Sequence, residues 1–149
     1  MNLSNAVYDF AVSLAGNPAK TALYEAIVHA DLYEEMKGAP ESKYVRVDDL
    51  RGSIPQPAAP NVLKEFNAFL DVHFLQIPQT QGLTDRLAAR NKVDAMAIEF
   101  IQAIYDDQRL GTNNCNIISD CSVQKVNDWR RVGTLKTPIT VVRLTINKK

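Results

Sequence analysis

The residues best suited to chemistry in this 149-residue chain are two cysteines, Cys115 and Cys121, and two histidines, His29 and His73. A structural zinc site needs four such ligands, usually arranged as closely spaced pairs. Here the cysteines are six positions apart, and neither histidine is near them in the sequence. We therefore expect the cysteines to be small packing residues, and we predict no metal ligand.

Nucleophilic catalysis would pair Cys115 or Cys121 with His73, because a thiol needs a nearby base. No glycine-rich turn or other activating context surrounds either cysteine. The acidic pairs Asp48–Asp49 and Asp106–Asp107 join sequence neighbours, whose side chains do not face each other on a helix. The glycines form no phosphate-binding pattern. The sequence therefore predicts no catalytic residue, no cofactor and no enzyme.

Two stretches are typical of contact surfaces. In the first, Trp129 is followed by Arg130 and Arg131, and Trp and Arg dominate the energetics of protein interfaces. The same residues could instead stack on a base and hold phosphates, or form a packed tryptophan with two solvated arginines. All three interpretations stay open at this stage.

The second stretch runs from Arg51 to Pro60, where three prolines remove backbone donors and favour an extended conformation. We expect no regular structure there. The segment is either a surface loop or an arm that reaches a neighbouring subunit. The candidate interface residues of both stretches are Arg51, Ile54, Pro55, Pro57, Trp129, Arg130 and Arg131.

The central element is expected between Phe66 and Ile77, where apolar side chains alternate with polar ones such as Asp71 and His73. Period-2 alternation predicts a strand with one buried face. Apolar residues also fall there at helical spacing, so a helix is the alternative. We prefer the strand, because phenylalanine and valine favour it and prolines bound the run.

Helical spacing predicts three helices around this strand. The first begins near the N-cap Ser4 and ends at Gly16, and the second spans about Ala19–Lys37. The third follows the N-cap Thr84 and runs to about Leu110. The apolar stripe expected for the second helix is Leu23, Ile27 and Ala30. That of the third is Leu87, Val93, Met96, Ala97, Phe100, Ile101 and Ile104.

A short strand is expected at Tyr44–Val47, and a C-terminal hairpin at Asn116–Val132 and Ile139–Ile146. The resulting fold class is α/β (α+β): a small mixed or antiparallel sheet with N-terminal helices and one long helix packed on it. Residues 1–149 are expected to form a single domain, with the proline-rich loop at 51–60.

Charge and composition exclude some partners. Lys plus Arg equals Asp plus Glu at 17 each, so no net charge draws the chain to DNA or anionic lipid. No apolar run approaches the roughly 18 residues of a membrane span. The N-terminus lacks the basic region of a secretory signal, so we expect a reducing cytoplasm and free thiols.

The order of elements resembles that of the tail-terminator or tail-completion proteins of tailed bacteriophages. The segments that carry the resemblance are Asn67–Pro78, Leu87–Leu110 and Thr140–Ile146. This chain differs by opening with two expected helices, where one is usual, and by its proline-rich loop. A neighbouring head-to-tail joining protein is the closest alternative.

The resemblance implies an α/β structural protein of the virion tail or neck, assembled in the host cytoplasm. Such proteins form a ring of identical subunits, commonly a hexamer, that joins the tail tube protein to the head-closure or connector protein. It implies no cofactor and no membrane, and nucleic acid only passes through the ring. Two other classes stay open: a small enzyme, and a nucleic-acid-binding module with a basic face at Arg51, Arg130 and Arg131.

Overall fold

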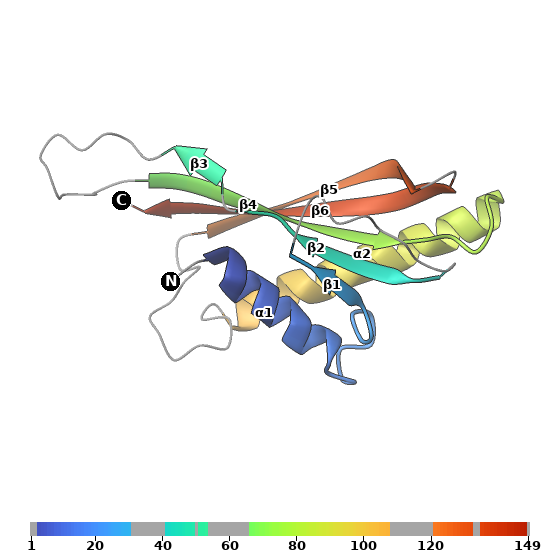
Figure 1. Cartoon of the computed structure of the whole chain (residues 1–149), viewed down its shortest axis with the longest axis horizontal. Coiled ribbons are helices and arrows are strands. Elements are labelled where there is room, and N and C mark those ends of the chain that lie inside the picture. The colour runs from blue at the N-terminus through green and yellow to red at the C-terminus, as the bar shows by residue number, and fades with distance from the viewer. Residues whose placement is uncertain are drawn as a thin grey trace, which may run out of the picture.

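The computed structural model describes residues 3–30, 41–49, 51–53, 66–107, 121–132 and 135–148. Within them one mixed sheet packs against two helices, which confirms the predicted α+β class (Figure 1). The elements in chain order are α1 (Leu3–Ala15), β1 (Ile27–His29), β2 (Lys43–Val47), β3 (Arg51–Ser53), β4 (Phe66–Gln76), α2 (Leu83–Asp106), β5 (Cys121–Val132) and β6 (Leu135–Lys148). The strand order is β1-β2-β4-β6-β5, with β3 paired to β4. Only the β1–β2 pairing is parallel among these described strands.

The segment around Leu70 is a strand, as predicted, and not a helix. β4 pairs with β2 on one side and with β6 on the other, so Val72 lies between Val47 and Val142. Leu70, Val72 and Phe74 are fully buried on one face of β4. The alternation of apolar and polar residues predicted this buried face, because successive side chains of a strand point to opposite faces.

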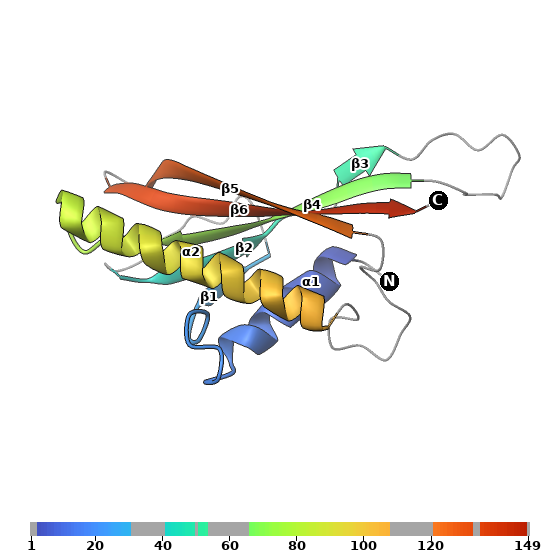
Figure 2. The ribbon, with the colours of Figure 1, turned by 180° about the vertical axis from the view of Figure 1, so that it is seen from behind.

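Both helices pack on that same face of the sheet (Figures 1 and 2). α2 contributes Val93, Met96, Ala97, Phe100 and Ile104 to the core, and α1 contributes Val7, Phe10, Ala11 and Leu14. The ring of Phe100 lies 5.3 Å from that of Phe74 and 6.2 Å from that of Phe10, measured between centroids. One aromatic side chain therefore joins both helices to the sheet.

The predicted second helix, Ala19–Lys37, is wrong over its described part. Turns follow α1, and the carboxylate of Glu99 on α2 accepts the backbone N–H groups of Ala22 and Leu23 at 3.3 and 3.0 Å. Leu23 is buried as expected, but Ile27 belongs to β1, which pairs with β2. Pairing with an existing strand outweighs a helical pattern in a segment with the β-branched pair Ile27-Val28. Residues 31–37 lie outside the described part.

The long helix α2 is confirmed with shifted ends. Its N-cap is Gly82, not Thr84, and its last residue is Asp106. The side chain of Thr80 shapes the preceding turn, since its hydroxyl accepts Gly82 N–H at 3.1 Å and donates to Asp85 at 2.5 Å. Similarly, Ser4 lies inside α1 and does not cap it. Predicted residues 108–111 lie outside the described part.

Arg51–Ser53 is also a correction, because these residues form the short strand β3 instead of irregular chain. Strand pairing is possible here because all three prolines of the segment come later. The hairpin is confirmed and longer than predicted at its C-terminal strand, with β5 beginning at Cys121 and β6 spanning Leu135–Lys148. Residues 116–120 lie outside the described part. Neither described helix is long and apolar enough to cross a bilayer.

Candidate functional site

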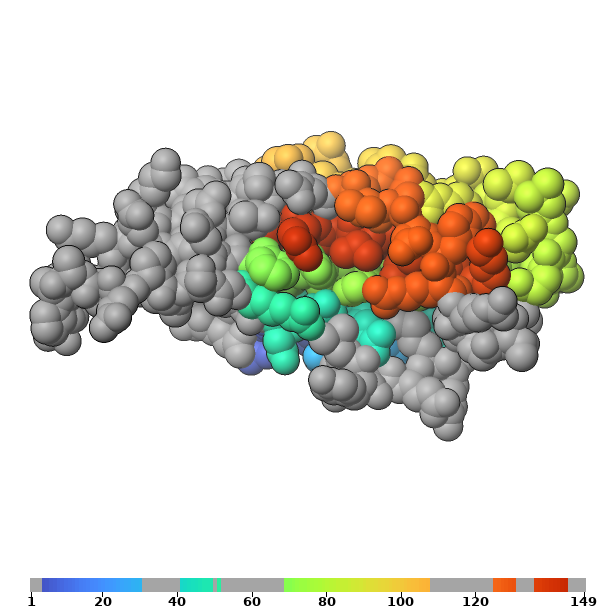
Figure 3. Space-filling view, turned by 90° about the horizontal axis from the view of Figure 1, so that it is seen from above, coloured from blue at the N-terminus to red at the C-terminus, as the bar shows by residue number. Residues whose placement is uncertain are grey.

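The side of the sheet turned away from α1 and α2, here called the open face, is covered by neither helix (Figure 3). It carries a small second apolar cluster of Tyr44, Leu75, Ile77 and Ile139. The ring of His29 stacks on Tyr44 at 5.6 Å between centroids. Val141 packs against this cluster, and its register partner Val126 is exposed. Polar side chains lie next to these apolar ones, so this face differs from the helix-covered one.

Four polar side chains form a chain of contacts on the open face, here called the polar cluster: Asp48, Asp71, His73 and Arg143. His73 Nε2 lies 2.9 Å from Asp48 Oδ2, and both residues are buried. Arg143 donates to both oxygens of Asp71, at 2.8 and 3.0 Å. These bonds with Asp71 raise the pKa of Arg143 above its ordinary value, so the guanidinium stays charged.

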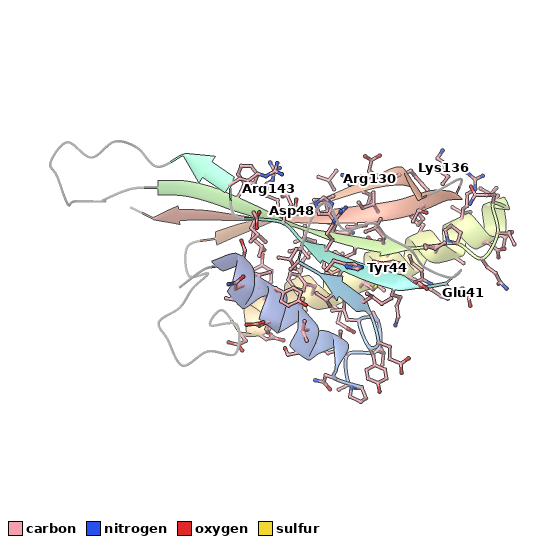
Figure 4. The ribbon with its side chains drawn as sticks, viewed as in Figure 1. Glu41, Tyr44, Asp48, Arg130, Lys136 and Arg143 are labelled. Atoms are coloured by element: carbon pink, nitrogen blue, oxygen red, sulfur yellow. The ribbon has the colours of Figure 1, made fainter. Side chains whose placement is uncertain are left out.

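Strand register brings these residues together. Asp71 and His73 are two positions apart on β4 and therefore share a face. Asp71 is directly opposite Arg143 of β6, and Asp48 follows β2, with its backbone N–H donating to the carbonyl of Asp71 at 3.0 Å. The guanidinium of Arg143 also lies 4.1 Å from the centroid of the Phe69 ring. Figure 4 shows Asp48 and Arg143 close together near the middle of the sheet.

No sequence pattern predicted this cluster. Its only local signal is the Asp71-x-His73 alternation, which predicts that both side chains lie on the face of the strand opposite the apolar one. The contribution of Asp48 depends on which strands are neighbours and in which register. No spacing in the sequence contains that information.

A second notable surface is an apolar stripe on the exposed side of α2. Four large side chains are half exposed or more: Leu83 at 64%, Leu87 at 50%, Ile98 at 54% and Tyr105 at 57%. At about 100° per residue, the last three lie within about 20° of one another around the helix axis. The stripe spans about 33 Å at about 1.5 Å per residue. Leu87 was predicted to be core, and this is wrong, because α2 has two apolar stripes and Leu87 belongs to the exposed one.

The exposed stripe runs beside the edge strand β5. Two side chains of α2 define the flank: Asp94 pairs with Lys125 of β5, and Arg90 donates to the carbonyls of Asp128 and Ile139 at 3.5 and 3.3 Å. On the helical wheel Arg90 lies about 60° to one side of Leu87, and Asp94 lies about 20° from it, between Leu83 and Leu87. Figure 3 shows α2 along the β5 side of the molecule. The twelve-residue edge of β5 and the stripe therefore face the same side.

The opposite side of the molecule ends in the short strand β1. Ile27 of β1 is 45% exposed and Val12 of α1 is 44% exposed. The two edges of the described sheet thus differ in length, neighbouring helix and side chains. They are two distinct surfaces on opposite sides of the subunit.

The predicted interface residues are distributed over different faces. Trp129 is half buried on the same face of β5 as Lys125, with the ammonium of Lys136 5.7 Å from its ring centroid. Arg130 is exposed and points to the opposite face, as neighbours on a strand do. Arg51 is exposed on β3. The side chain of Arg131 and residues Ile54, Pro55 and Pro57 lie outside the described part.

One cavity of about 410 Å³ opens between α2, the end of β2 and the turn that follows α1. Lys43, Lys92, Glu41 and Gln76 line it. The ammonium of Lys43 already donates to the carbonyls of Ala22 and Tyr24, at 3.2 and 2.5 Å. The cavity is lined by charges of both signs, and the ammonium of Lys43 is already hydrogen-bonded to the turn. The cavity therefore favours no ligand class.

Comparison with known proteins gives no relative from which to transfer a function. No protein-family model matches the chain, and no curated protein matches it significantly.

Proposed function

We propose that this chain is a structural subunit that assembles with copies of itself into a closed ring. The observation that carries the proposal is the exposed stripe on α2 beside β5, the strand at that edge of the described sheet. Four large apolar side chains exposed on one side of a helix are typical of a protein contact surface. Within the described sheet β5 pairs with β6 alone, and pairing of a long edge strand with a neighbouring chain satisfies its outer backbone groups.

The arrangement favours a ring over a two-fold dimer. A ring arises when one surface of each subunit binds a different surface of the next and the rotation closes. The stripe and β5 lie on one side, while β1 with Ile27 lies on the other. Docking of the first side onto the second would bury both sets of apolar side chains in every subunit.

The place of the ring in a larger particle rests on the resemblance of element order. Within that proposal the protein is a tail terminator or tail-completion protein of a tailed bacteriophage, and the ring is a hexamer. One end of the ring would bind the tail tube protein and the other the head-closure protein. The ring acts by shape and contact, with no cofactor, and DNA passes through its channel.

The first experiment introduces negative charge into the stripe. Changing Ile98→Asp and Tyr105→Asp together would place two carboxylates in the proposed contact. Both positions are more than half exposed, so the folded subunit tolerates the change. The matched control is Ala88→Asp, an exposed position of α2 that lies about 100° away from Leu87 around the axis.

Sedimentation velocity and negative-stain imaging give the readout, with circular dichroism to confirm folding. We expect rings from the wild type and from Ala88→Asp, and folded monomers from the double variant. A wild type that stays monomeric at high concentration would overturn the ring. Rings from the double variant would show that the stripe is not the contact. Binding of the wild-type ring to isolated tail tubes tests the phage assignment separately.

A further inference from the structure

We propose that Asp48, Asp71 and His73 form a binding site for a divalent transition-metal ion, with Zn²⁺ as the best match. The proposal concerns the open face of the sheet, so it is independent of the stripe and of ring formation. Each residue offers one ligand atom, a carboxylate oxygen or a ring nitrogen. These three atoms lie within 4.8 Å of one another.

A small ion would fit after the ligand atoms move, because their separations of up to 4.8 Å would have to close by up to about 1.4 Å. Zinc bonds of roughly 2.0–2.2 Å in a tetrahedron place ligand atoms about 3.4 Å apart. The His73 Nε2 and Asp48 Oδ2 atoms, now 2.9 Å apart, would separate by about 0.5 Å on that basis. Three protein ligands leave the fourth position of a zinc ion for water.

A buried carboxylate oxygen in the cluster points to a missing cation. Asp48 Oδ1 has no hydrogen-bond partner in the part of the chain that the structure describes. Asp48 is 5% exposed, so water does not easily replace the missing bond. Burial of a carboxylate oxygen without a donor is costly, and a cation removes that cost.

The ligand set selects the class of metal. Mg²⁺ and Ca²⁺ prefer all-oxygen sites, whereas an imidazole nitrogen favours zinc and its neighbours. The two carboxylates and the Arg143 guanidinium sum to one negative charge with His73 neutral. The site therefore attracts a cation.

Arg143 competes with the metal for Asp71. It now holds both oxygens of that carboxylate, but its own side chain is 44% exposed and has room to swing into solvent. Loss of Arg143 would free Asp71 and remove a positive charge. Metal binding should therefore become tighter when Arg143 is replaced, a direction that a purely structural role does not predict.

The test uses untagged, chelator-treated protein titrated with ZnCl₂ by calorimetry, with native mass spectrometry for stoichiometry. We expect one zinc per chain, a loss of at least tenfold in affinity for Asp48→Asn and His73→Gln, and tighter binding for Arg143→Gln. The control is Asp49→Asn, an exposed neighbour, which should bind like the wild type.

Cys115→Ser with Cys121→Ser removes the thiols as competing ligands and should leave the affinity unchanged. Melting without metal checks that each variant is folded, and Arg143→Gln stays informative if a ligand variant does not fold. Absence of stoichiometric zinc from both the wild type and Arg143→Gln would overturn the site. So would binding that is lost with the cysteines. The ring variant Ile98→Asp with Tyr105→Asp should bind zinc normally, which separates this result from the proposed function.

Discussion

The two faces of the sheet are built from the same strands but by different interactions. On the helix-covered face, Leu70, Val72 and Phe74 of β4 pack against Phe100 of α2. On the open face, the intervening residues of β4 form hydrogen bonds and ion pairs with Asp48 and Arg143. The first face depends on removing apolar area from water, which is nondirectional. The second depends on the placement of single atoms.

This contrast indicates how substitutions on each face should affect the protein. A packed core tolerates swaps that keep volume and apolar character. In a buried polar pair each group satisfies the hydrogen-bonding capacity of the other, so substitution of one residue leaves the other group unsatisfied. Changes on the two faces should therefore differ in size and in response to the partner residue.

The largest effect is expected on the covered face. Phe100→Ala should lower the free energy of unfolding by about 3–5 kcal/mol, because it removes a fully buried ring that contacts Phe10 and Phe74. Urea unfolding followed by circular dichroism measures it. The control is Tyr105→Ala, an exposed aromatic on the same helix, which should cost within about 0.5 kcal/mol. Equal effects at the two positions would contradict the described core.

Sequence patterns revealed the covered face well. Alternation identified β4, and helical spacing identified α2, because each has one strongly apolar side facing a single core. The same reasoning failed at Ile27, where helical spacing was accidental and the partner strand β2 decided the structure. The same reasoning also placed Leu87 in the core stripe of α2, since spacing alone does not say which apolar side of a helix faces the sheet.

The open face was not predictable in the same way. Asp48 follows β2, His73 lies on β4 and Arg143 lies on β6, and their proximity follows from strand order and register. Neither property is encoded in a local pattern. The interface residues near Trp129 were predicted from residue type alone, and only the strand geometry shows that Trp129 and Arg130 point to opposite faces.

The next effect is expected on the open face. Asp48→Ala should cost about 1–3 kcal/mol, because it leaves His73 Nε2 buried without its partner. Denaturant unfolding in chelator measures it without interference from metal. The comparison is Arg143→Ala, which breaks a more exposed pair with Asp71 and should cost about 0–1 kcal/mol. A larger loss for Arg143→Ala would mean that the exposed pair, and not the buried one, organises this face.

The smallest effects are expected at the hairpin, and they concern assembly instead of folding. Trp129 and Arg130 are neighbours on β5, yet one is half buried on the helix side and the other is exposed on the open side. Single alanine variants therefore report which face of the hairpin meets a neighbouring subunit. Both should remain folded, since neither side chain belongs to the core clusters.

If the contact includes the helix side, Trp129→Ala should raise the subunit concentration needed for half-assembly by up to about tenfold, the effect of losing roughly 1.4 kcal/mol at an aromatic anchor. Arg130→Ala should change it by less than about threefold and act mainly on its salt dependence, as exposed charges at an interface rim do. Sedimentation over a range of concentrations and salt measures both. The reverse order would place the contact on the open face, beside the polar cluster, and would move the proposed ring interface away from the stripe on α2.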